Sequence, residues 1–277
     1  MTAMQNLDIK AIARLIEQVA AAEAMPHWRN LAAGDIVEKN GPDDVVTVAD
    51  KAVERVLTRQ LAALLPGSDV VGEEAVHADP GLLARLRQPG MVWVIDPIDG
   101  TSAFARGEAG FAVMVALIVD GDPVAGFLHA PALGQTTYAM RGEGAWQGPS
   151  QATAVRLPRP AAATGLSDLV GIVGTRAFSD ARRSAVVAQA RHFKSLGPNS
   201  GCAGIDYLEL AAGRVDFALY SKSEPWDHLP GLAILTEQGF GYSRFDGSPY
   251  RPGDNTGGLL VSASATLLAP LRDVLLG

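Results

Sequence analysis

The sequence predicts a mixed α/β fold in which layers of sheet and helix are stacked on one another. Three observations support this prediction. Two amphipathic helices are expected within the first 65 residues, the middle of the chain is rich in short β-strands, and the second half alternates strands with helices. A chain of 277 residues can bury a large core, so neither disulfides nor a structural metal is needed to hold such a fold.

In the first half of the chain, each expected element follows from apolar spacing and from turn residues. Apolar residues at helical intervals predict helices over residues 7–25, 48–65 and 82–86, with a polar loop at 38–44. Short apolar runs bounded by Gly, Pro or Asp predict strands over residues 69–72, 91–95, 111–119, 123–129 and 136–140. We expect a mostly antiparallel sheet from these strands.

The second half alternates between the two periodicities. The expected strands are 169–173, 215–220 and 259–262, and the expected helices are 181–189, 205–212, 229–238 and 265–275. Residues 158–165 read PRPAAATG and are linker-like. We expect one domain, with an N-terminal α+β lobe over about residues 1–150 and a C-terminal α/β lobe over about residues 151–277.

Composition limits the partners and the compartment. The chain carries 23 basic and 30 acidic residues, a net charge of −7, which argues against binding to nucleic-acid polymers or to anionic membranes. Cys202 is the only cysteine, so no intrachain disulfide can form and a reducing compartment fits. No signal peptide or membrane span is evident, and we expect a soluble cytoplasmic protein.

Acidic residues follow three of the expected strands. Glu73 follows the first of them, Asp96 and Asp99 follow the second, and Asp227 follows the strand at 215–220. Taken singly, such residues are typical of solvated turns and helix caps. Strand ends in layered α/β folds gather at ligand sites, and converging carboxylates need a cation. Oxygen ligands without nearby Cys or His favour magnesium or manganese over zinc.

The stretch VIDPIDGTSAF, residues 94–104, is the strongest of these signals. Pro97 lies between the two aspartates and stiffens the backbone that carries them. The hydroxyl of Thr101 follows directly and could orient a water molecule together with a distant carboxylate. Asp50 is a candidate for that carboxylate, and a helix-capping role for it is equally compatible with the sequence.

Several motifs in this order resemble the inositol monophosphatase family. They are GEE at residues 72–74, DVVTVAD at 44–50, DPIDGT at 96–101 and WDHLPG at 226–231. The family belongs to a superfamily of magnesium-dependent, lithium-sensitive phosphatases that includes fructose-1,6-bisphosphatase and the bisphosphate nucleotidases. The resemblance implies a layered αβαβα sandwich, hydrolysis of phosphate monoesters and a homodimer.

The resemblance also implies roles for individual residues. Glu73, Asp96 and the carbonyl of Ile98 match the ligands of a first Mg²⁺. Asp96, Asp99 and Asp227 match those of a second, with Mn²⁺ as a possible substitute. Glu73 reaches a third, weaker ion through water.

Catalytic and substrate roles follow from the same match. Thr101 and Asp50 resemble the pair that positions and deprotonates the attacking water, and Glu73 contributes to catalysis through its metal. Gly100 and Thr101 offer backbone donors to the phosphate where a helix is expected to begin. Asp227 is expected to contact the substrate as well as the metal.

Some residues depart from the family pattern. Ala103 stands where Asn is common, and Tyr220 stands where inositol-cleaving members carry a glutamate that contacts ring hydroxyls. Asp206 is a candidate for a hydroxyl contact or a helix cap. Lys222 and Arg176 could meet a second phosphate or a carboxylate, although surface solvation is the commoner role of such residues.

We therefore expect a Mg²⁺-dependent phosphomonoesterase that acts on a small polyol, sugar or nucleotide phosphate without a phosphoenzyme. Histidinol-phosphatase activity, 3′(2′),5′-bisphosphate nucleotidase activity and a non-catalytic metal- and phosphate-binding role are the alternatives, together with a purely structural metal protein. The intact acid set and Thr101 favour an enzyme, because a binding module needs no water-activating pair.

Overall fold

The computed structural model describes residues 7–41, 44–160, 165–253 and 257–277. The helices are α1 Ile9–Val19, α2 Val48–Leu64, α3 Glu73–Ala78, α4 Thr101–Ala105, α5 Asp180–Val187, α6 Ala203–Ala211, α7 Pro225–Glu237 and α8 Leu268–Leu276. The strands are β1 Ile36–Gly41, β2 Asp44–Thr47, β3 Asp69–Gly72, β4 Met91–Asp99, β5 Ala112–Val119, β6 Asp122–Ala130, β7 Gln135–Met140, β8 Gly144–Gly148, β9 Val155–Arg156, β10 Val170–Gly174, β11 Ser195–Pro198, β12 Phe217–Tyr220, β13 Gly241–Arg244 and β14 Leu259–Ser262.

The strands form two large sheets and one hairpin. The first sheet has the order β3-β4-β5-β6-β7-β8-β9, and only its β3–β4 pair is parallel, as the sequence predicts for a mostly antiparallel sheet. The second sheet has the order β11-β10-β12-β14-β13, with β10 parallel to both β11 and β12. β1 and β2 pair only with each other.

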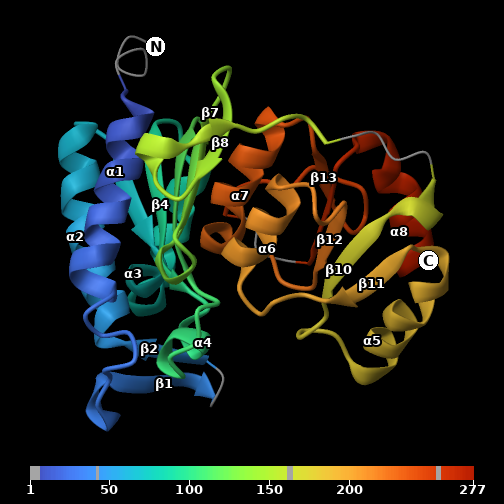
Figure 1. The fold of residues 1–277 in the computed structure, drawn as a ribbon, viewed down its shortest axis with the longest axis horizontal. Coiled ribbons are helices and arrows are strands. Elements are labelled where there is room, and N and C mark those ends of the chain that lie inside the picture. The colour runs from blue at the N-terminus through green and yellow to red at the C-terminus, as the bar shows by residue number, and fades with distance from the viewer. Residues whose placement is uncertain (1–6, 42–43, 161–164, 254–256) are drawn as a thin grey trace.

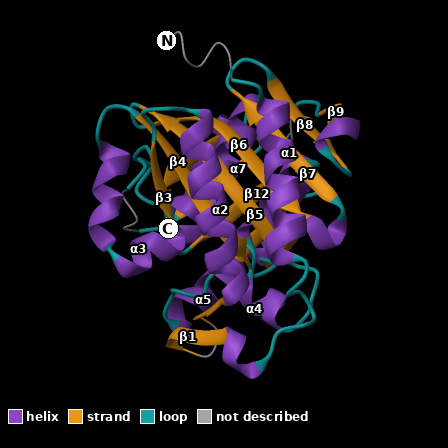
Figure 2. Ribbon diagram, turned by 90° about the vertical axis from the view of Figure 1, so that its left-hand side faces the viewer, coloured by secondary structure: helices purple, strands orange, loops and turns teal. Residues whose placement is uncertain are grey.

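Helices and sheets alternate in five layers (Figure 1). α1 and α2 cover the outer face of the first sheet, where α2 contacts β4 and α1 contacts β7 (Figure 2). α7 packs against β5 and β6 on the inner face and lies beside α6. α5 and α8 contact each other on the outer side of the second sheet. The layered αβαβα arrangement is therefore confirmed.

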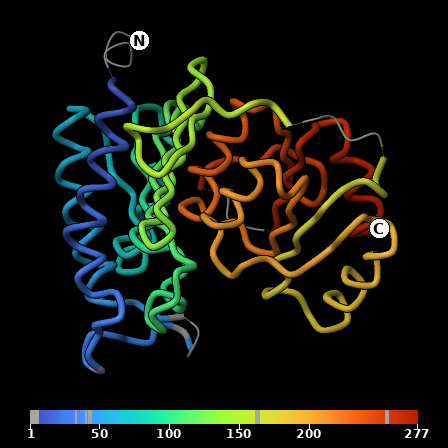
Figure 3. Tube along the Cα trace, viewed as in Figure 1, coloured from blue at the N-terminus to red at the C-terminus, as the bar shows by residue number. Residues whose placement is uncertain are grey.

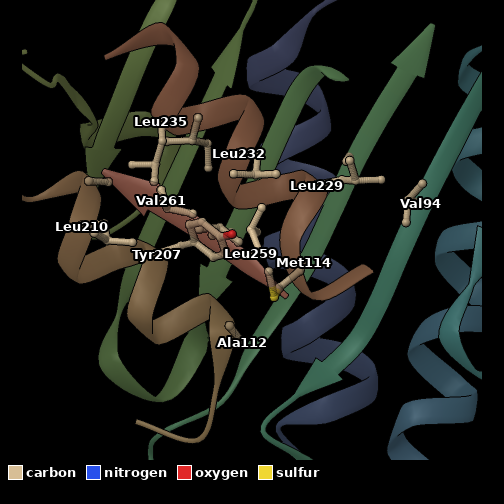
Figure 4. Packing of buried hydrophobic residues seen from close by; sticks show 14 of the residues in the cluster. Val94, Ala112, Met114, Tyr207, Leu210, Leu229, Leu232, Leu235, Leu259 and Val261 are labelled. Carbon is tan, nitrogen blue, oxygen red and sulfur yellow. The ribbon is translucent and has the colours of Figure 1, made fainter. Parts of the chain in front are cut away.

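Three groups of buried apolar residues hold these layers together. The largest lies between the sheets, where Leu229 and Leu232 of α7 meet Met114 of the first sheet and Val261 of the second (Figure 4). A second joins α1 and α2 to the first sheet, and a third joins α5 and α8 to the second. Figure 3 shows that the chain up to β9 builds one side of the molecule and the later chain builds the other.

Some expected elements differ from those observed. The first helix ends at Val19 and continues as a π-helical turn over Ala20–Ala24. The segment expected at 82–86 is a 3₁₀ helix, Pro80–Arg87. The polar loop expected at 38–44 includes parts of the hairpin strands β1 and β2, although residues 42–43 lie outside the described chain.

Six strands were not predicted from the sequence: β1 and β2, which lie around the expected polar loop, and β8, β9, β11 and β13. Three of them, β9, β11 and β13, are edge strands. Edge strands are short and half-exposed, so they carry few apolar residues, and β11 even contains Pro198. The linker-like stretch 158–165 is described only in part, because residues 161–164 lie outside the described chain. Within the described ranges, no helix is long and apolar enough to cross a bilayer.

Candidate active site

The aspartates of the DPIDGT motif lie within β4, which continues through them rather than ending before them. In its pairing with β5, Asp96 lies opposite Met114 and Asp99 opposite Ala112, so two residues of β4 face one residue of β5. This is a β-bulge. Residues three apart on a regular strand point to opposite faces, and the extra residue cancels that alternation. The bulge therefore allows Asp96 and Asp99 to point the same way.

Asp227 of α7 completes the acid cluster that Asp96 and Asp99 of β4 begin. The helix expected to begin at residue 229 begins at Pro225, so Asp227 lies in the first turn of α7. The N-cap residue of α7 is Glu224, not Asp227. One oxygen of each of Asp96, Asp99 and Asp227 lies within 4.8 Å of the others. α7 brings this acid to β4 because its apolar residues pack on the first sheet.

Burial and mutual repulsion disfavour ionisation of this cluster. Burial first, and then the charges of Glu73, Asp99 and Asp227, raise the pKa of Asp96 well above its usual range. Burial also raises the pKa of Asp227 well above its usual range and that of Asp99 to about 7. Asp96 Oδ1 is buried and has no hydrogen-bond partner among the described residues. An oxygen-only cluster with such an orphan atom fits a hard divalent cation.

Glu73 lines the same cavity at the start of α3, outside the compact group of three aspartates. Lys39 Nζ lies 3.0 Å from Glu73 Oε1 and 2.5 Å from Glu74 Oε1, and only 5% of the Lys39 side chain is exposed. Burial opposes the charge of Lys39, but the two carboxylates outweigh it and raise its pKa. The hairpin strand β1 thus supplies a cation beside the proposed metal ligand Glu73.

A buried carboxylate of α2 holds the segment that carries Glu73. Glu54 accepts the backbone N–H of Glu74 at 2.8 Å and that of Ala75 at 2.9 Å. A Cβ on Gly72 would lie 2.3 Å from the Glu54 carboxyl carbon, so glycine permits this close approach. Glu54 therefore fixes the turn between β3 and α3, and Glu73 is the residue at that turn.

Asp50 and Thr101 meet, as the resemblance implies. Thr101 Oγ1 lies 3.2 Å from Asp50 Oδ1 and 2.8 Å from the carbonyl oxygen of Ile98. Asp50 also forms the capping box of α2, because its Oδ2 accepts the backbone N–H of Thr47 at 2.8 Å. Asp50 thus caps α2 with one carboxylate oxygen and contacts Thr101 with the other, so capping leaves an oxygen for the catalytic role that the resemblance implies. Burial raises the pKa of Asp50 to about 7.

Gly100 connects the bulge to the short helix α4. It has φ of 82°, and a Cβ there would lie 2.6 Å from the carbonyl oxygen of Gly110, so only glycine fits. α4 begins at Thr101, as expected. The side chain of Ile98 packs into the core beneath α1 and α2, which leaves its carbonyl directed to the Thr101 hydroxyl.

Two residues orient Asp99 and were missed in the sequence. Gly204 N–H donates to Asp99 Oδ2 at 2.5 Å, and the Cys202 thiol donates to the same oxygen at 3.0 Å. Cys202 is buried, and burial raises its pKa well above the usual range, so it stays a neutral donor. Its contact with Asp99 depends on where α6 begins, which no local pattern indicates.

Glu73, Asp99 and Asp227 line one cavity of about 270 Å³ together with residues of the second sheet, and Asp96 is buried behind them. Tyr220 lines it at the end of β12, but its hydroxyl is buried close to the Asp206 carboxylate. Asp206 is 2% exposed, does not line the cavity and accepts the backbone N–H of Ser200 at 2.9 Å. α6 is capped at Cys202, so Asp206 is neither its N-cap nor placed to touch a substrate hydroxyl.

His228 also lines the cavity, but both of its ring nitrogens are engaged. Nε2 lies 3.1 Å from the carbonyl oxygen of Lys222, which can only accept, so Nε2 carries the proton. Nδ1 then accepts from the Tyr207 hydroxyl at 3.0 Å. Burial lowers the pKa of His228 to about 4, so the ring is neutral and has no free nitrogen for proton transfer.

Comparison with known proteins agrees with this geometry. The model of the inositol monophosphatase family matches residues 2–274. The chain belongs to this family. It is 30% identical to the fructose-1,6-bisphosphatase/inositol-1-monophosphatase of Thermotoga maritima, over 80% of this chain and 79% of that one.

Two further comparisons cover almost the whole chain. It is 30% identical to the histidinol-phosphatase of Streptomyces coelicolor, over 98% of this chain and 96% of the relative. The structure of an IMPase from Thermotoga maritima superposes with a TM-score of 0.78 at 25% identity, covering 95% of this chain and 94% of the other. As a member of this family, the protein is a phosphatase that hydrolyses phosphate monoesters.

The raised pKa values predict how the stability of the metal-free phosphatase depends on pH. The pKa values of Asp50 and Asp99 rise from 3.8 to about 7, so the folded state retains protons that the unfolded state loses. The free energy of unfolding should therefore fall as pH rises from about 4 to about 7, by on the order of 1 kcal/mol per pH unit for each group.

Thermal melts in a chelator across this pH range would measure the effect. Saturating Mg²⁺ should reverse the trend, because the cation competes with protons for the same oxygens. A melting temperature that does not change between these pH values in chelator would contradict the expectation.

Proposed function

We propose that this protein is a Mg²⁺-dependent phosphomonoesterase for a small polyol, sugar or nucleotide phosphate. The observation that carries the proposal is the convergence of three aspartate carboxylates within 4.8 Å, with one buried oxygen left without a partner. Histidinol-phosphatase activity is a second candidate, because a relative with that name matches nearly the full chain. Nucleotidase activity on a 3′(2′),5′-bisphosphate is an open alternative within the same class.

The ligand sets follow from the placement of the acids. Glu73, Asp96 and the Ile98 carbonyl would hold one Mg²⁺, and Asp96, Asp99 and Asp227 would hold a second, with Asp96 shared. Glu73 would also serve a third, weaker ion, and Mn²⁺ could replace Mg²⁺. When bound, these cations supply the Lewis acidity that lowers the pKa of a water molecule and neutralises the leaving oxygen.

Thr101 and Asp50 are proposed to hold and move the proton of the attacking water. When the Ile98 carbonyl holds a cation, the single proton of the Thr101 hydroxyl would be donated to Asp50 Oδ1 instead of to that carbonyl, which leaves an oxygen lone pair to accept a hydrogen bond from water. As the water loses its proton to Thr101 Oγ1, the original Thr101 proton passes to Asp50. The charge of the transferred phosphoryl group makes positioning the main task of the protein, and no phosphoenzyme is required.

We assign substrate binding to the turn at Gly100 and Thr101 and to the cavity residues Asp227 and Tyr220. The backbone N–H groups of Gly100 and Thr101 would donate to the phosphate. Asp227 and Tyr220 would contact the alcohol part of the substrate. Tyr220 can donate a hydrogen bond but cannot accept as a carboxylate does, so weak turnover of inositol monophosphate is expected.

Phosphate release from a panel of phosphomonoesters tests the proposal. Activity should require Mg²⁺, disappear in excess chelator, return when Mg²⁺ is restored and fall when lithium is added. A protein that releases phosphate from no member of the panel would support a metal- and phosphate-binding role instead. A rate on inositol monophosphate well above every other substrate would contradict the expectation for Tyr220.

We also propose that the protein is a single phosphatase domain of two lobes, about residues 1–150 and 151–277, that it acts as a cytoplasmic homodimer, and that it does not act on nucleic-acid polymers or membranes. The packing of α7 from the second lobe on β5 and β6 of the first supports one domain. The family resemblance supports the dimer. The single cysteine supports a cytoplasmic location, and the net negative charge supports the absence of action on nucleic-acid polymers and membranes. Light scattering tests the dimer, since a mass of 28.9 kDa rather than twice that value would contradict it.

A further inference from the structure

The first turn of α3 carries Glu73, yet this short helix has little of its own to hold it in place. α3 has six residues, and only the side chain of Val76 is buried among them. Its N-cap residue is Gly72, which offers no side chain to the free backbone N–H groups of the first turn. A helix of this length is not stable by itself in water. Contacts from elsewhere in the fold must therefore fix its position.

Glu54 of α2 supplies the missing cap from another helix. Its two carboxylate oxygens accept the N–H groups of Glu74 and Ala75, the second and third residues of α3, at 2.8 and 2.9 Å. The side chain of an N-cap residue accepts hydrogen bonds from the same two positions. The three heavy atoms nearest to the position of a Cβ on Gly72 all belong to the Glu54 carboxylate. Glu54 thus takes the place, in space and in hydrogen bonding, of the side chain that Gly72 lacks.

The same helix holds the proposed water-activating pair. Asp50 lies one turn before Glu54 on α2, and a spacing of four residues puts both side chains on one face of the helix. Asp50 Oδ1 contacts the Thr101 hydroxyl. α2 is itself fixed by apolar side chains such as Val53 and Leu57, which are fully buried in the cluster that joins it to the first sheet. α2 therefore sets the distance between the Asp50–Thr101 pair and the first turn of α3.

We propose that Glu54 is a positioning residue of the active site: by capping α3 from α2, it holds the Glu73 carboxylate where the first Mg²⁺ would bind. This inference rests on the proposed function, because it needs Glu73 to be a metal ligand. Groups that orient metal ligands without touching the metal commonly contribute about ten- to hundredfold to metal affinity or activity. Glu54 is not among the described residues that line the cavity, so its effect must pass through α3.

Glu54→Gln tests this role with little change in side-chain size. The amide keeps one acceptor oxygen but turns a donor toward the other N–H group of α3. The Mg²⁺ concentration for half-maximal phosphate release should rise about tenfold or more, while KM and kcat at saturating Mg²⁺ should change little. Burial raises the pKa of Glu54 to about 7, although its two N–H donors oppose this rise, so measurements at pH 8 compare Gln with the ionised carboxylate.

Glu237→Gln is the matched control. Glu237 accepts two backbone N–H groups in the same way, from Gly142 at 3.0 Å and from Gly144 at 2.9 Å. These contacts lie at the turn between β7 and β8, and none of the three residues lines the active-site cavity. The control removes a similar pair of hydrogen bonds, so it should lower stability without changing the Mg²⁺ requirement.

Two measurements need no substrate. In chelator, hydrogen exchange at the amides of Glu74 and Ala75, followed by NMR, should be about tenfold faster in Glu54→Ala than in the wild type, because both acceptors are lost. The rise in melting temperature that Mg²⁺ produces should be smaller in Glu54→Gln and in Glu54→Ala than in the wild type.

A second substitution at Gly72 should rescue the loss. Gly72→Ser alone should raise the Mg²⁺ requirement, since its side chain would collide with the Glu54 carboxylate. In Glu54→Ala that space is free, and the extended backbone of Gly72 (φ −104°, ψ 155°) suits an N-cap serine, whose hydroxyl can cap α3 directly. The double variant should therefore need less Mg²⁺ than either single variant, which two independent structural losses would not produce.

Failure of this inference differs from failure of the proposed function. A Glu54→Gln enzyme with the wild-type Mg²⁺ requirement would overturn the positioning role while hydrolysis itself persists. An equal rise in Glu237→Gln would overturn it too, because the shift would then reflect a general loss of stability. So would a double variant that needs as much Mg²⁺ as Glu54→Ala. If the wild type hydrolyses no phosphomonoester, the proposed function is wrong, and the Mg²⁺-dependent melts of the wild type and the variants decide the inference.

Discussion

Asp96→Asn is expected to lower phosphate release by on the order of a thousandfold or more, because Asp96 is the ligand shared by both proposed cations. The same substitution should raise the melting temperature of the metal-free protein. Asp96 is 1% exposed and faces Glu73, Asp99 and Asp227, so the metal-free folded state must either hold its charge against theirs or retain a proton that the unfolded state loses, and Asn carries neither cost. Lower activity with higher stability is a combination that simple damage to the fold does not produce.

Phosphate release and thermal melts with and without Mg²⁺ would measure both effects. In the wild type Mg²⁺ should raise the melting temperature, and in Asp96→Asn this increase should be largely lost. Asp273→Asn is a suitable control, since that side chain is 72% exposed on α8 and distant in sequence from the cavity residues. Undiminished activity of Asp96→Asn would refute the metal assignment.

Thr101→Ala should lower kcat by about a hundredfold to a thousandfold, the usual range for loss of a positioned acid–base group. KM and the Mg²⁺-dependent rise in melting temperature should change little, because the substitution removes no proposed metal ligand. Thr101→Ser keeps the hydroxyl and should restore most of the rate. The hydroxyl matters through its contact with Asp50 Oδ1 at 3.2 Å.

A double-substitution cycle tests whether the two residues act as a unit. Thr101→Ala combined with Asp50→Asn should lower kcat little further than either single change, because each one already breaks the same proton path. Additive losses would mean that the two residues act independently. A Thr101→Ala enzyme with wild-type kcat, or a Thr101→Ser enzyme as slow as Thr101→Ala, would refute the proton path itself.

The sequence predicted most of the fold because long patterns of apolar residues become the buried faces of helices and strands. α2 and the strands β3, β5, β6, β7 and β14 lie within a residue or two of their expected positions. The errors occur where local signals are weak or misleading. β9, β11 and β13 are short edge strands, and α7 begins four residues before its periodic apolar pattern, at Pro225, a residue that favours the first turn of a helix.

For the site, the motifs identified the central residues but not the residues that contact them. Asp50 and Thr101 are 51 positions apart and were paired through the resemblance, and the structure brings them together. Lys39 and Glu54 were not identified, because their partners on α3 become neighbours only when β1 and α2 pack around that turn. Asp206 was a candidate for a substrate hydroxyl contact or a helix cap, and it is buried beside Ser200 instead.

The sequence alone determined the chemistry of this protein: an oxygen-rich set of acids, a hydroxyl beside them, one cysteine and a layered α/β fold. Only the tertiary structure decided which way those groups point. The bulge in β4 places Asp96 and Asp99 on one side, and the packing of α7 on the first sheet brings Asp227 to them. The register of β10 and β12 sets Gly174 opposite Tyr220 at the cavity wall. Strand register and helix packing are long-range properties, and a local sequence pattern does not encode them.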